Sequence, residues 1–416
     1  MRIRFESRLA RLAVLLGVVA LLTPYALMAA SRYRAARLAS RNDKLSLQRA
    51  IEIEPGDAEY QRRLARYALY VDQDTPGALL HYQVATNLNR YSAPSWLGVA
   101  QSQLILGNEA AALEAIRRAL EIDPHTPSVA WEAGNLLVAL GQADAAMPQF
   151  RFVAENDPAM TIQVLQLLRR LESSPARAAQ LGLPPDPGIH FIFINLLAQS
   201  GDIEGAKQVW PIVMGLRRSF DPRHAFFFLD LLVKAGQPEV AYNCWRELAK
   251  TSPDVGRLNQ AGNLLENASF EHPILNGGFD WRYLPSPEVD IQAETSDAHE
   301  GSHSLLAKFK GQRTSDAGMH QYVLLEPNAR YHFRGFVKSD LQTANGFRFM
   351  LVDAKTGKHL FDTNDTIGDR QWTEYSADFR TSADTRLAVF LLGRNNTTLV
   401  RGNLLIDDLR LEKVTP

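Results

Sequence analysis

The chain has 416 residues, a length that suggests two or three domains rather than one. Its content of 46% apolar and 22% charged residues is ordinary for a globular protein and excludes disorder over most of the length, while the single cysteine, Cys244, excludes a disulfide scaffold and a cysteine zinc cluster. The formal charge of −1 hides an asymmetry, because residues 1–41 contain eight arginines and one acid, whereas the remainder contains 37 basic and 45 acidic residues. An acidic remainder argues against a nucleic-acid partner.

The N-terminal arginines flank an apolar stretch at residues 12–30, which has nineteen residues and no charge. As a helix it would be about 28 Å long, close to the thickness of the bilayer hydrocarbon. We therefore expect residues 1–41 to form a single-pass anchor in the cell inner membrane, with the bulk of the chain facing the periplasm or the exterior. A cleaved secretory signal and a buried soluble helix are the alternatives. The signal is the weaker fit, because the stretch is longer than a signal needs and Met28 occupies a position of the cleavage site that prefers a small residue.

The middle of the chain repeats every 34 residues. A small residue that permits close helix packing, a glycine that ends a first helix and a proline that stops a second helix recur at this spacing. A second pair of units follows an irregular stretch at residues 161–187, and residues 45–55 have the pattern of half a unit, so we expect about five repeats. The recurring sets are Ala78, Ala112 and Ala146; Tyr82, Ile116 and Phe150; Gln73, Gly107 and Gly141; Pro124 and Pro158; and, 35 residues apart, Gly201, Ala206 and Trp210 with Gly236, Ala241 and Trp245.

This pattern resembles the tetratricopeptide repeat. The resemblance implies an α-solenoid of helix pairs over residues 42–258, with a protein or peptide bound on its concave face. Trp96, Trp131, Trp210 and Trp245 occur at helical spacing among apolar residues, so packing between helices explains them better than ligand binding.

After Pro253 the helical period gives way to short strand-like runs separated by turn sequences. Strands at this spacing predict a two-sheet antiparallel sandwich. The predicted strands are 322–325, 331–337, 347–352, 372–379, 387–392 and 404–406.

An ordered set of short motifs in this region resembles the jelly-roll carbohydrate-binding modules of the galactose-binding-like class. The resemblance covers about residues 263–414, so we expect a sandwich domain over 263–416 that binds a polysaccharide. The motifs are Asn267–Glu271, Gly278–Trp281, Gly301–Leu305, Gln321, Tyr331–Ser339, Trp372 and Ile406–Leu409.

A sugar-binding groove requires an aromatic plate beside planar polar side chains, because sugar rings have an apolar C–H face and a rim of hydroxyls. Alternation along the predicted strands places some such residues away from the core. The tryptophans could equally be core or edge aromatics, and the arginines solvated charges on a sheet face. The candidate glycan-binding residues are Trp281, Gln321, Arg334, Phe336, Arg348 and Trp372.

The chain requires no cofactor that its sequence reveals. The carbohydrate-binding-module resemblance implies a structural calcium joining the first and last strands, with Glu271 and Asp408 at the matching positions. A surface carboxylate explains either residue equally well.

No nucleophile elbow, phosphate loop, HExxH motif or pair of catalytic carboxylates is recognisable, so we do not expect an enzyme. The sequence predicts a multidomain α + β protein with a transmembrane helix, an α-solenoid and an antiparallel jelly roll. We expect it to serve as a scaffold between a protein partner and a glycan, in surface polysaccharide assembly or export. A purely structural protein–protein scaffold and an atypical glycoside hydrolase are the alternatives.

Overall fold

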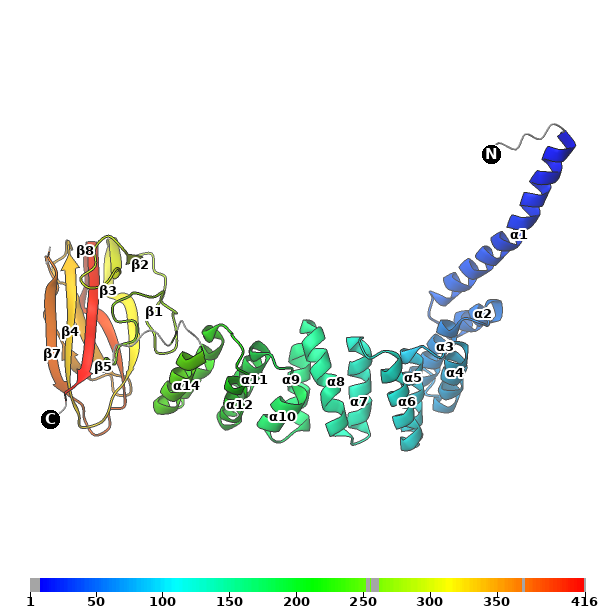
Figure 1. Cartoon of the computed structure of the whole chain (residues 1–416), viewed down its shortest axis with the longest axis horizontal. Coiled ribbons are helices and arrows are strands. Elements are labelled where there is room, and N and C mark those ends of the chain that lie inside the picture. Colours follow the sequence, from blue (N-terminus) through cyan, green and yellow to red (C-terminus); the bar gives the residue numbers. More distant parts are fainter. Residues whose placement is uncertain (1–7, 252–254, 256–261, 369–370, 415–416) are drawn as a thin grey trace. The chain divides into compact units, whose positions relative to one another are not determined.

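The computed structural model describes residues 8–251, 255, 262–368 and 371–414 (Figure 1). The chain divides into two compact units, Met1–Pro184 and Pro185–Pro416. The unit boundary falls in the proline-rich run that follows Leu183, which the sequence marks as a break in the repeat pattern.

The first helix, α1 (Arg8–Ala39), contains the predicted apolar span. The most apolar 18 residues within Leu12–Ala39 have a mean hydropathy of 2.2, and among the described residues this is the one helix long and apolar enough to cross a membrane. The apolar helix continues into the helical unit, because Ala35 and Ala39 in its last turns are buried against Leu47 and Tyr60. With α2 (Lys44–Ile53), the end of α1 therefore forms the first helix pair, which includes the predicted half unit.

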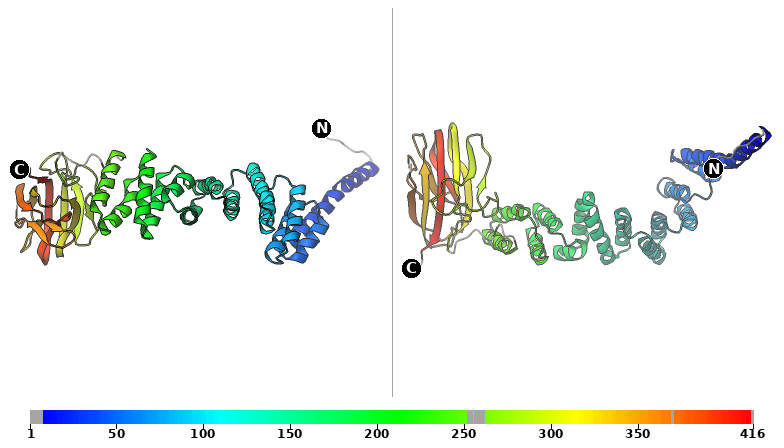
Figure 2. Two further views of the ribbon diagram at one scale, coloured as in Figure 1. Left: turned by 90° about the horizontal axis from the view of Figure 1, so that it is seen from below. Right: turned by 45° about the horizontal axis from the view of Figure 1, so that its top comes forward.

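Unit 1 continues as antiparallel helix pairs in chain order (Figure 2). Glycines in a left-handed conformation end first helices, with φ of +80° at Gly107 and +71° at Gly141. Large rings fill the space left by two glycines: an added Cβ would lie 2.7 Å from the Phe150 ring at Gly134, within one pair, and 2.2 Å from the Tyr82 ring at Gly98, between two successive pairs. The remaining helices of the unit are α3 (Ala58–Tyr70), α4 (Thr75–Leu88), α5 (Ala93–Ile105), α6 (Glu109–Ile122), α7 (Pro127–Ala139), α8 (Ala143–Asn156), η1 (Pro158–Met160), α9 (Thr161–Leu171) and α10 (Pro175–Gly182).

The irregular stretch at 161–187 thus folds largely as a shortened helix pair. Gly182 of α10 packs against Leu168 of α9, where an added Cβ would lie 2.6 Å from the leucine side chain. The period is lost in the sequence because α10 has only 8 residues.

Unit 2 begins with two more helix pairs, in which Trp210 and Trp245 are buried as the packing interpretation predicts. These helices are α11 (Pro187–Gln199), α12 (Ile203–Gly215), η2 (Pro222–Ala225), α13 (Phe226–Lys234) and α14 (Pro238–Thr251).

The strands of unit 2 are all antiparallel. Two of them, β3 and β8, pair along almost their whole length and are bent where the register shifts between Lys310 and His320. Positive φ values at Gly311 (+85°) and Gly318 (+73°) accompany the bend. The strands are β1 (Arg282–Tyr283), β2 (Val289–Glu294), β3 (Ser304–Leu324), β4 (Arg330–Ser339), β5 (Arg348–Asp353), β6 (His359–Asp362), β7 (Thr373–Arg380) and β8 (Leu387–Lys413).

The bent β3–β8 ribbon contributes to both layers of a sandwich. Layer A consists of β2, the first half of β3, the second half of β8, β4 and β7; layer B consists of β1, the second half of β3, the first half of β8, β5 and β6. Rings from the two layers meet between them, with 5.1 Å from the Phe333 centroid on β4 to the Phe349 centroid on β5. This antiparallel jelly roll agrees with the predicted fold class.

The connection before β1 packs onto the last helix pair of the same unit. The Phe279 ring lies 5.0 Å from Tyr242 and 6.4 Å from Trp245, both on α14. Arg282 on β1 donates hydrogen bonds of 2.5 and 3.2 Å to the carboxylate of Asp230 on α13. The sandwich is therefore joined to α13 and α14 by aromatic packing and an ion pair.

Candidate binding sites

Two of the six predicted glycan-binding residues are core residues, and their prediction is wrong. Trp281 is 3% exposed, and its indole N–H donates to the carbonyl of Asn267 at 3.1 Å. Gln321 is fully buried and bonds both the N–H and the C=O of Glu266, each at 2.9 Å. Neither side chain can reach a ligand, because both hold the segment before β1 against the sandwich.

Three other predicted residues lie together on layer A. Alternation along β4 points Arg334 and Phe336 outward, as the sequence predicts, and Trp372 lies just before β7. The ring of His299 stacks on Phe336 at 3.6 Å and meets Trp372 edge-on at 5.8 Å. We call His299, Phe336 and Trp372 the layer-A cluster.

Polar contacts also occupy the layer-A cluster. Asp297 accepts from the indole N–H of Trp372 at 3.2 Å and from Lys338 at 2.6 Å. Arg334 lies 5.9 Å from the Phe336 centroid. The aromatic faces and hydrogen-bonding groups therefore largely contact one another, and they hold the connection between β2 and β3 onto the sheet.

The sixth predicted residue, Arg348 on β5, lies apart from the cluster. Its guanidinium forms an ion pair and a short hydrogen bond with Asp365. It is half-buried and is already paired within the chain.

The carboxylates of the two residues predicted to hold calcium already form hydrogen bonds or ion pairs with other protein groups. Glu271 accepts hydrogen bonds from the N–H and hydroxyl of Ser302, at 2.7 and 2.6 Å, and from the N–H of His303, at 2.8 Å. Burial alone would raise the pKa of Glu271, but these hydrogen bonds outweigh it and lower the pKa to about 2.

Asp408 is close to three cationic or protonatable side chains: Arg410 at 3.1 Å, Arg334 at 3.5 Å and His299 at 3.8 Å. Calcium needs several free oxygen ligands, whereas donors and cations surround both carboxylates, so this arrangement does not fit the ion. Among the described residues, no three His, Cys, Asp or Glu side chains are grouped to hold a metal. The calcium site stays a prediction without support from this geometry.

A groove of about 480 Å³ lies on the outer face of layer B, where the connection after β1 passes beside β3 and β8. Alternation along β3 turns His320 and Tyr322 outward, while their neighbour Gln321 faces the core. We call this the layer-B groove. It is lined by Leu284, Ser286, Val289, Thr314, Asp316, Gly318, Met319, His320, Tyr322, Val389 and Leu391.

The layer-B groove combines an aromatic ring with polar groups. One face of Tyr322 is covered by the guanidinium of Arg282, 4.9 Å from the ring centroid, which Asp230 in turn holds. Burial, and then the charge of Arg282, lower the pKa of His320, so the imidazole is neutral at pH 7 and has one donor and one acceptor. The residue predicted from the sequence, Gln321, is one position away from the groove residues His320 and Tyr322 and on the opposite face of β3.

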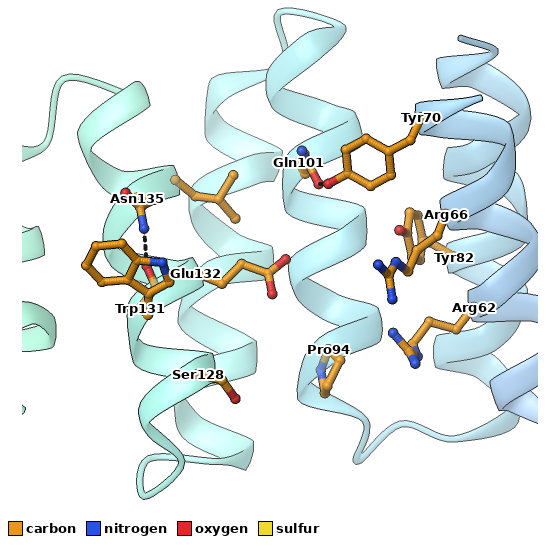
Figure 3. A pocket seen from close by; sticks show the side chains of 11 residues that line it. Arg62, Arg66, Tyr70, Tyr82, Pro94, Gln101, Ser128, Trp131, Glu132 and Asn135 are labelled. Carbon is orange, nitrogen blue, oxygen red and sulfur yellow. Dashed lines mark hydrogen bonds between the residues drawn. The ribbon is translucent and has the colours of Figure 1, made fainter. Parts of the chain in front are cut away.

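A second pocket, of about 550 Å³, lies among the first helices of three successive pairs in unit 1 (Figure 3). Arg62, Arg66 and Tyr70 follow one face of α3, and Glu132 extends from α7 on the opposite side. We call it the α3–α5–α7 pocket. Its lining is completed by Tyr82, Pro94, Gln101, Ser128, Trp131, Asn135 and Leu136.

Comparison with known proteins agrees with this architecture. Residues 262–397 match the family model of a carbohydrate binding domain. No curated protein matches the chain.

Three solved structures are similar to parts of this chain. A CBM4 structure is 12% identical, with 36% of this chain and 99% of that chain covered and a TM-score of 0.29. The CBM22-1 xylan-binding domain of Paenibacillus barcinonensis Xyn10C is 18% identical, with 38% and 99% covered and a TM-score of 0.28. YrrB, a TPR protein with an unusual peptide-binding site, is 20% identical, with 50% and 93% covered and a TM-score of 0.24. The sandwich includes the segment that matches a carbohydrate binding domain, and the helix pairs recur with the 34-residue period of the tetratricopeptide pattern.

Proposed function

We propose that this chain is a non-catalytic binding protein whose sandwich binds a glycan in the layer-B groove and whose helix pairs bind a protein partner. The main support for the glycan is the position of the groove: an open hollow with an aromatic ring and hydrogen-bonding groups, inside the segment that matches a carbohydrate binding domain. The layer-A cluster is the second candidate surface, favoured by its two predicted aromatics, Phe336 and Trp372.

The layer-B groove suits an uncharged polysaccharide. The exposed part of the Tyr322 ring and the nearby Leu284, which is 78% exposed, offer apolar surface to the C–H face of a sugar. His320 and Thr314 offer hydrogen bonds to hydroxyl groups. A groove open along the sheet suits an internal segment of a chain.

The test is a polysaccharide array probed with the detergent-solubilised full chain. We expect at least one polysaccharide to be retained, and we expect Tyr322→Ala and His320→Ala each to weaken its binding at least several-fold, because each removes a groove contact. Phe336→Ala and Trp372→Ala are matched controls on the other layer, with circular dichroism to verify folding. Loss in the layer-A variants alone would move the site to the layer-A cluster, and no retention by folded protein would disprove glycan binding.

The apolar helix α1 supports the proposal of a single-pass inner-membrane anchor, with both units on the periplasmic or outer side. We infer that the protein connects a glycan to a membrane-bound assembly, in the assembly or export of a surface polysaccharide. Mass spectrometry of the mature N-terminus would distinguish the anchor from a cleaved signal.

Two rival functions have distinct outcomes. A purely structural scaffold would bind protein partners but no glycan. A glycoside hydrolase would release new reducing ends from a polysaccharide that the sandwich binds, and we expect none.

A further inference from the structure

We propose that the α3–α5–α7 pocket binds an extended peptide segment that presents a carboxylate to Arg66 and a cationic side chain to Glu132. This inference rests on the proposed function, because it assigns a chemistry to the protein partner of the helix pairs. It concerns unit 1 alone.

The first observation is a pair of opposite charges without partners. Arg62 is held by its neighbour Glu59 through two hydrogen bonds of 2.7 and 2.6 Å. Arg66, one turn further along the same face of α3, is exposed and makes no ion pair or hydrogen bond with any residue that the structure describes. Glu132 likewise has no such partner within the described part of the chain, although it extends into the same pocket (Figure 3).

The environment of Glu132 indicates what its partner must be. Its side chain is exposed within the pocket, and the surrounding residues partly remove it from water. This desolvation raises the pKa of Glu132 and outweighs the opposite influence of Arg66 and Arg62. A cation in contact with Glu132 would add to the stabilisation of the carboxylate by the two arginines, neither of which forms an ion pair with it.

The second observation is a matched pair of amides. Gln101 on α5 and Asn135 on α7 are 34 residues apart and occupy equivalent positions in successive repeats. The side-chain oxygen of Gln101 accepts a hydrogen bond from the Tyr70 hydroxyl at 2.8 Å. The side-chain nitrogen of Asn135 donates to the backbone carbonyl of Trp131 at 2.7 Å. Gln101 therefore retains N–H donors and Asn135 an acceptor, and no described residue uses them.

A free donor and a free acceptor on neighbouring helices match the C=O and N–H of an extended peptide backbone. Trp131 supplies an apolar wall, and its edge-on contact with Phe150, at 5.7 Å between centroids, fixes its orientation. A nucleic acid would need a uniformly positive surface, which Glu132 prevents. A neutral glycan would leave both charges uncompensated. The pocket thus fits a peptide with charges of both signs.

The experiment uses the detergent-solubilised full chain and synthetic fluorescent nine-residue peptides on a Ser/Thr/Val background. One set contains a single Glu and a single Lys at varied separation; matched sets contain only the Glu, only the Lys, or neither. We expect fluorescence anisotropy to give the tightest binding for a Glu/Lys peptide at one preferred separation, at least tenfold tighter than for the uncharged peptides.

Charge reversal provides the decisive variants. Arg66→Glu should abolish the preference for Glu-containing peptides, and Glu132→Lys should abolish the preference for Lys-containing ones. Arg118→Glu on α6 makes the same charge change on an exposed residue outside the pocket lining and should change neither preference.

Two outcomes would overturn the proposal and can be told apart. Equal binding of all peptide sets, or preferences that survive both charge reversals, would refute the charge-matched ligand but leave a protein partner on the helix pairs. Binding of no peptide at all would count against peptide recognition by the solenoid as well, and circular dichroism at 222 nm of the same sample would verify that the helices are folded.

Discussion

Asp280 has a carboxyl group buried where its charged form is destabilised. It lies in the connection before β1, is fully buried, and accepts a hydrogen bond of 2.6 Å from the N–H of Leu275 through one carboxyl oxygen. Its other oxygen has no hydrogen-bond partner. Burial raises the pKa of Asp280 to about 7.

This raised pKa makes the stability of the sandwich depend on pH. Between the ordinary value near 4 and the folded value near 7, the folded state holds a proton that the unfolded chain has lost. The free energy of unfolding therefore falls as pH rises through this window, by on the order of 3–4 kcal/mol.

We expect Asp280→Asn to remove most of this fall, because an amide is neutral at every pH and still accepts the hydrogen bond from Leu275. Urea unfolding at pH 5 and pH 8, followed by near-ultraviolet circular dichroism, measures the difference. Asp384→Asn, at an exposed position, is the matched control and should leave the wild-type pH dependence unchanged. An undiminished fall in the Asp280→Asn variant would contradict the assignment.

At the scale of elements, the packing of one helix pair on the next depends on a ring and a glycine fitting together. Gly98 on α5 is buried, and a Cβ there would lie 2.2 Å from the ring of Tyr82, which is 3% exposed. Gly98→Ala gains about 1 kcal/mol in helix propensity, but overpacking costs about 1–3 kcal/mol. The contact is too short to relax without moving a buried ring, so overpacking should dominate.

We therefore expect Gly98→Ala to lower the midpoint of thermal unfolding by a few degrees, as measured by circular dichroism at 222 nm. Gly56→Ala is the matched control, because no atom lies within 4 Å of its added Cβ and its φ is not positive. Adding Tyr82→Leu to Gly98→Ala should recover part of the loss. Equal effects at Gly98 and Gly56 would show that the ring is not the cause.

The elements also show where sequence periodicity was sufficient. The 34-residue period located the helix pairs, because each column has one local physical cause such as a helix stop or a close contact. The strand pattern did not predict β2 or the first half of β3. Charged residues such as Asp290 and Lys308 lie within these strands, and no run of apolar residues bounded by turn sequences marks them. The strand pattern could not reveal that β3 and β8 bend to serve two layers.

Two things prevented a full prediction of the candidate sites from the sequence: their residues lie far apart in the chain, and the face of a strand on which a residue lies was misjudged. Phe336 and Trp372, two of the six candidates, both contact His299, but His299 and Asp297 come from a connection with no pattern of its own. On β3, the predicted residue Gln321 is a core residue, whereas its neighbour Tyr322 lines the groove, because a shift of one residue reverses the face of a strand. The charges of the α3–α5–α7 pocket come from helices far apart in sequence and became visible only in the fold.

At the scale of the whole molecule, the near-zero charge is the sum of a positive N-terminal segment and an acidic remainder. The eight N-terminal arginines flank or follow the apolar part of α1, and Arg32 forms an ion pair of 3.1 Å with Glu54 in the first helix pair. The last turns of α1 are therefore part of the helical unit as well as of the apolar helix.

This double role leads to a prediction about two truncations. A chain beginning at Ser31 loses the apolar span but keeps Ala35 and Ala39, whose buried side chains complete the core with Leu47 and Tyr60. A chain beginning at Asp43 keeps α2 but loses both alanines, so Leu47 and Tyr60 become exposed to water.

We expect the Ser31 chain to be soluble without detergent and to unfold at the same temperature as the full chain. The Asp43 chain should unfold a few degrees lower, because burial of about 0.8 kcal/mol per methyl-sized group is lost and the first helix pair is incomplete. Detergent phase partitioning and thermal unfolding measure the two properties separately. If the Asp43 chain were as stable as the Ser31 chain, the end of α1 would not be part of the folded unit, and the apolar helix would be an appendage rather than a continuous extension of the first helix pair.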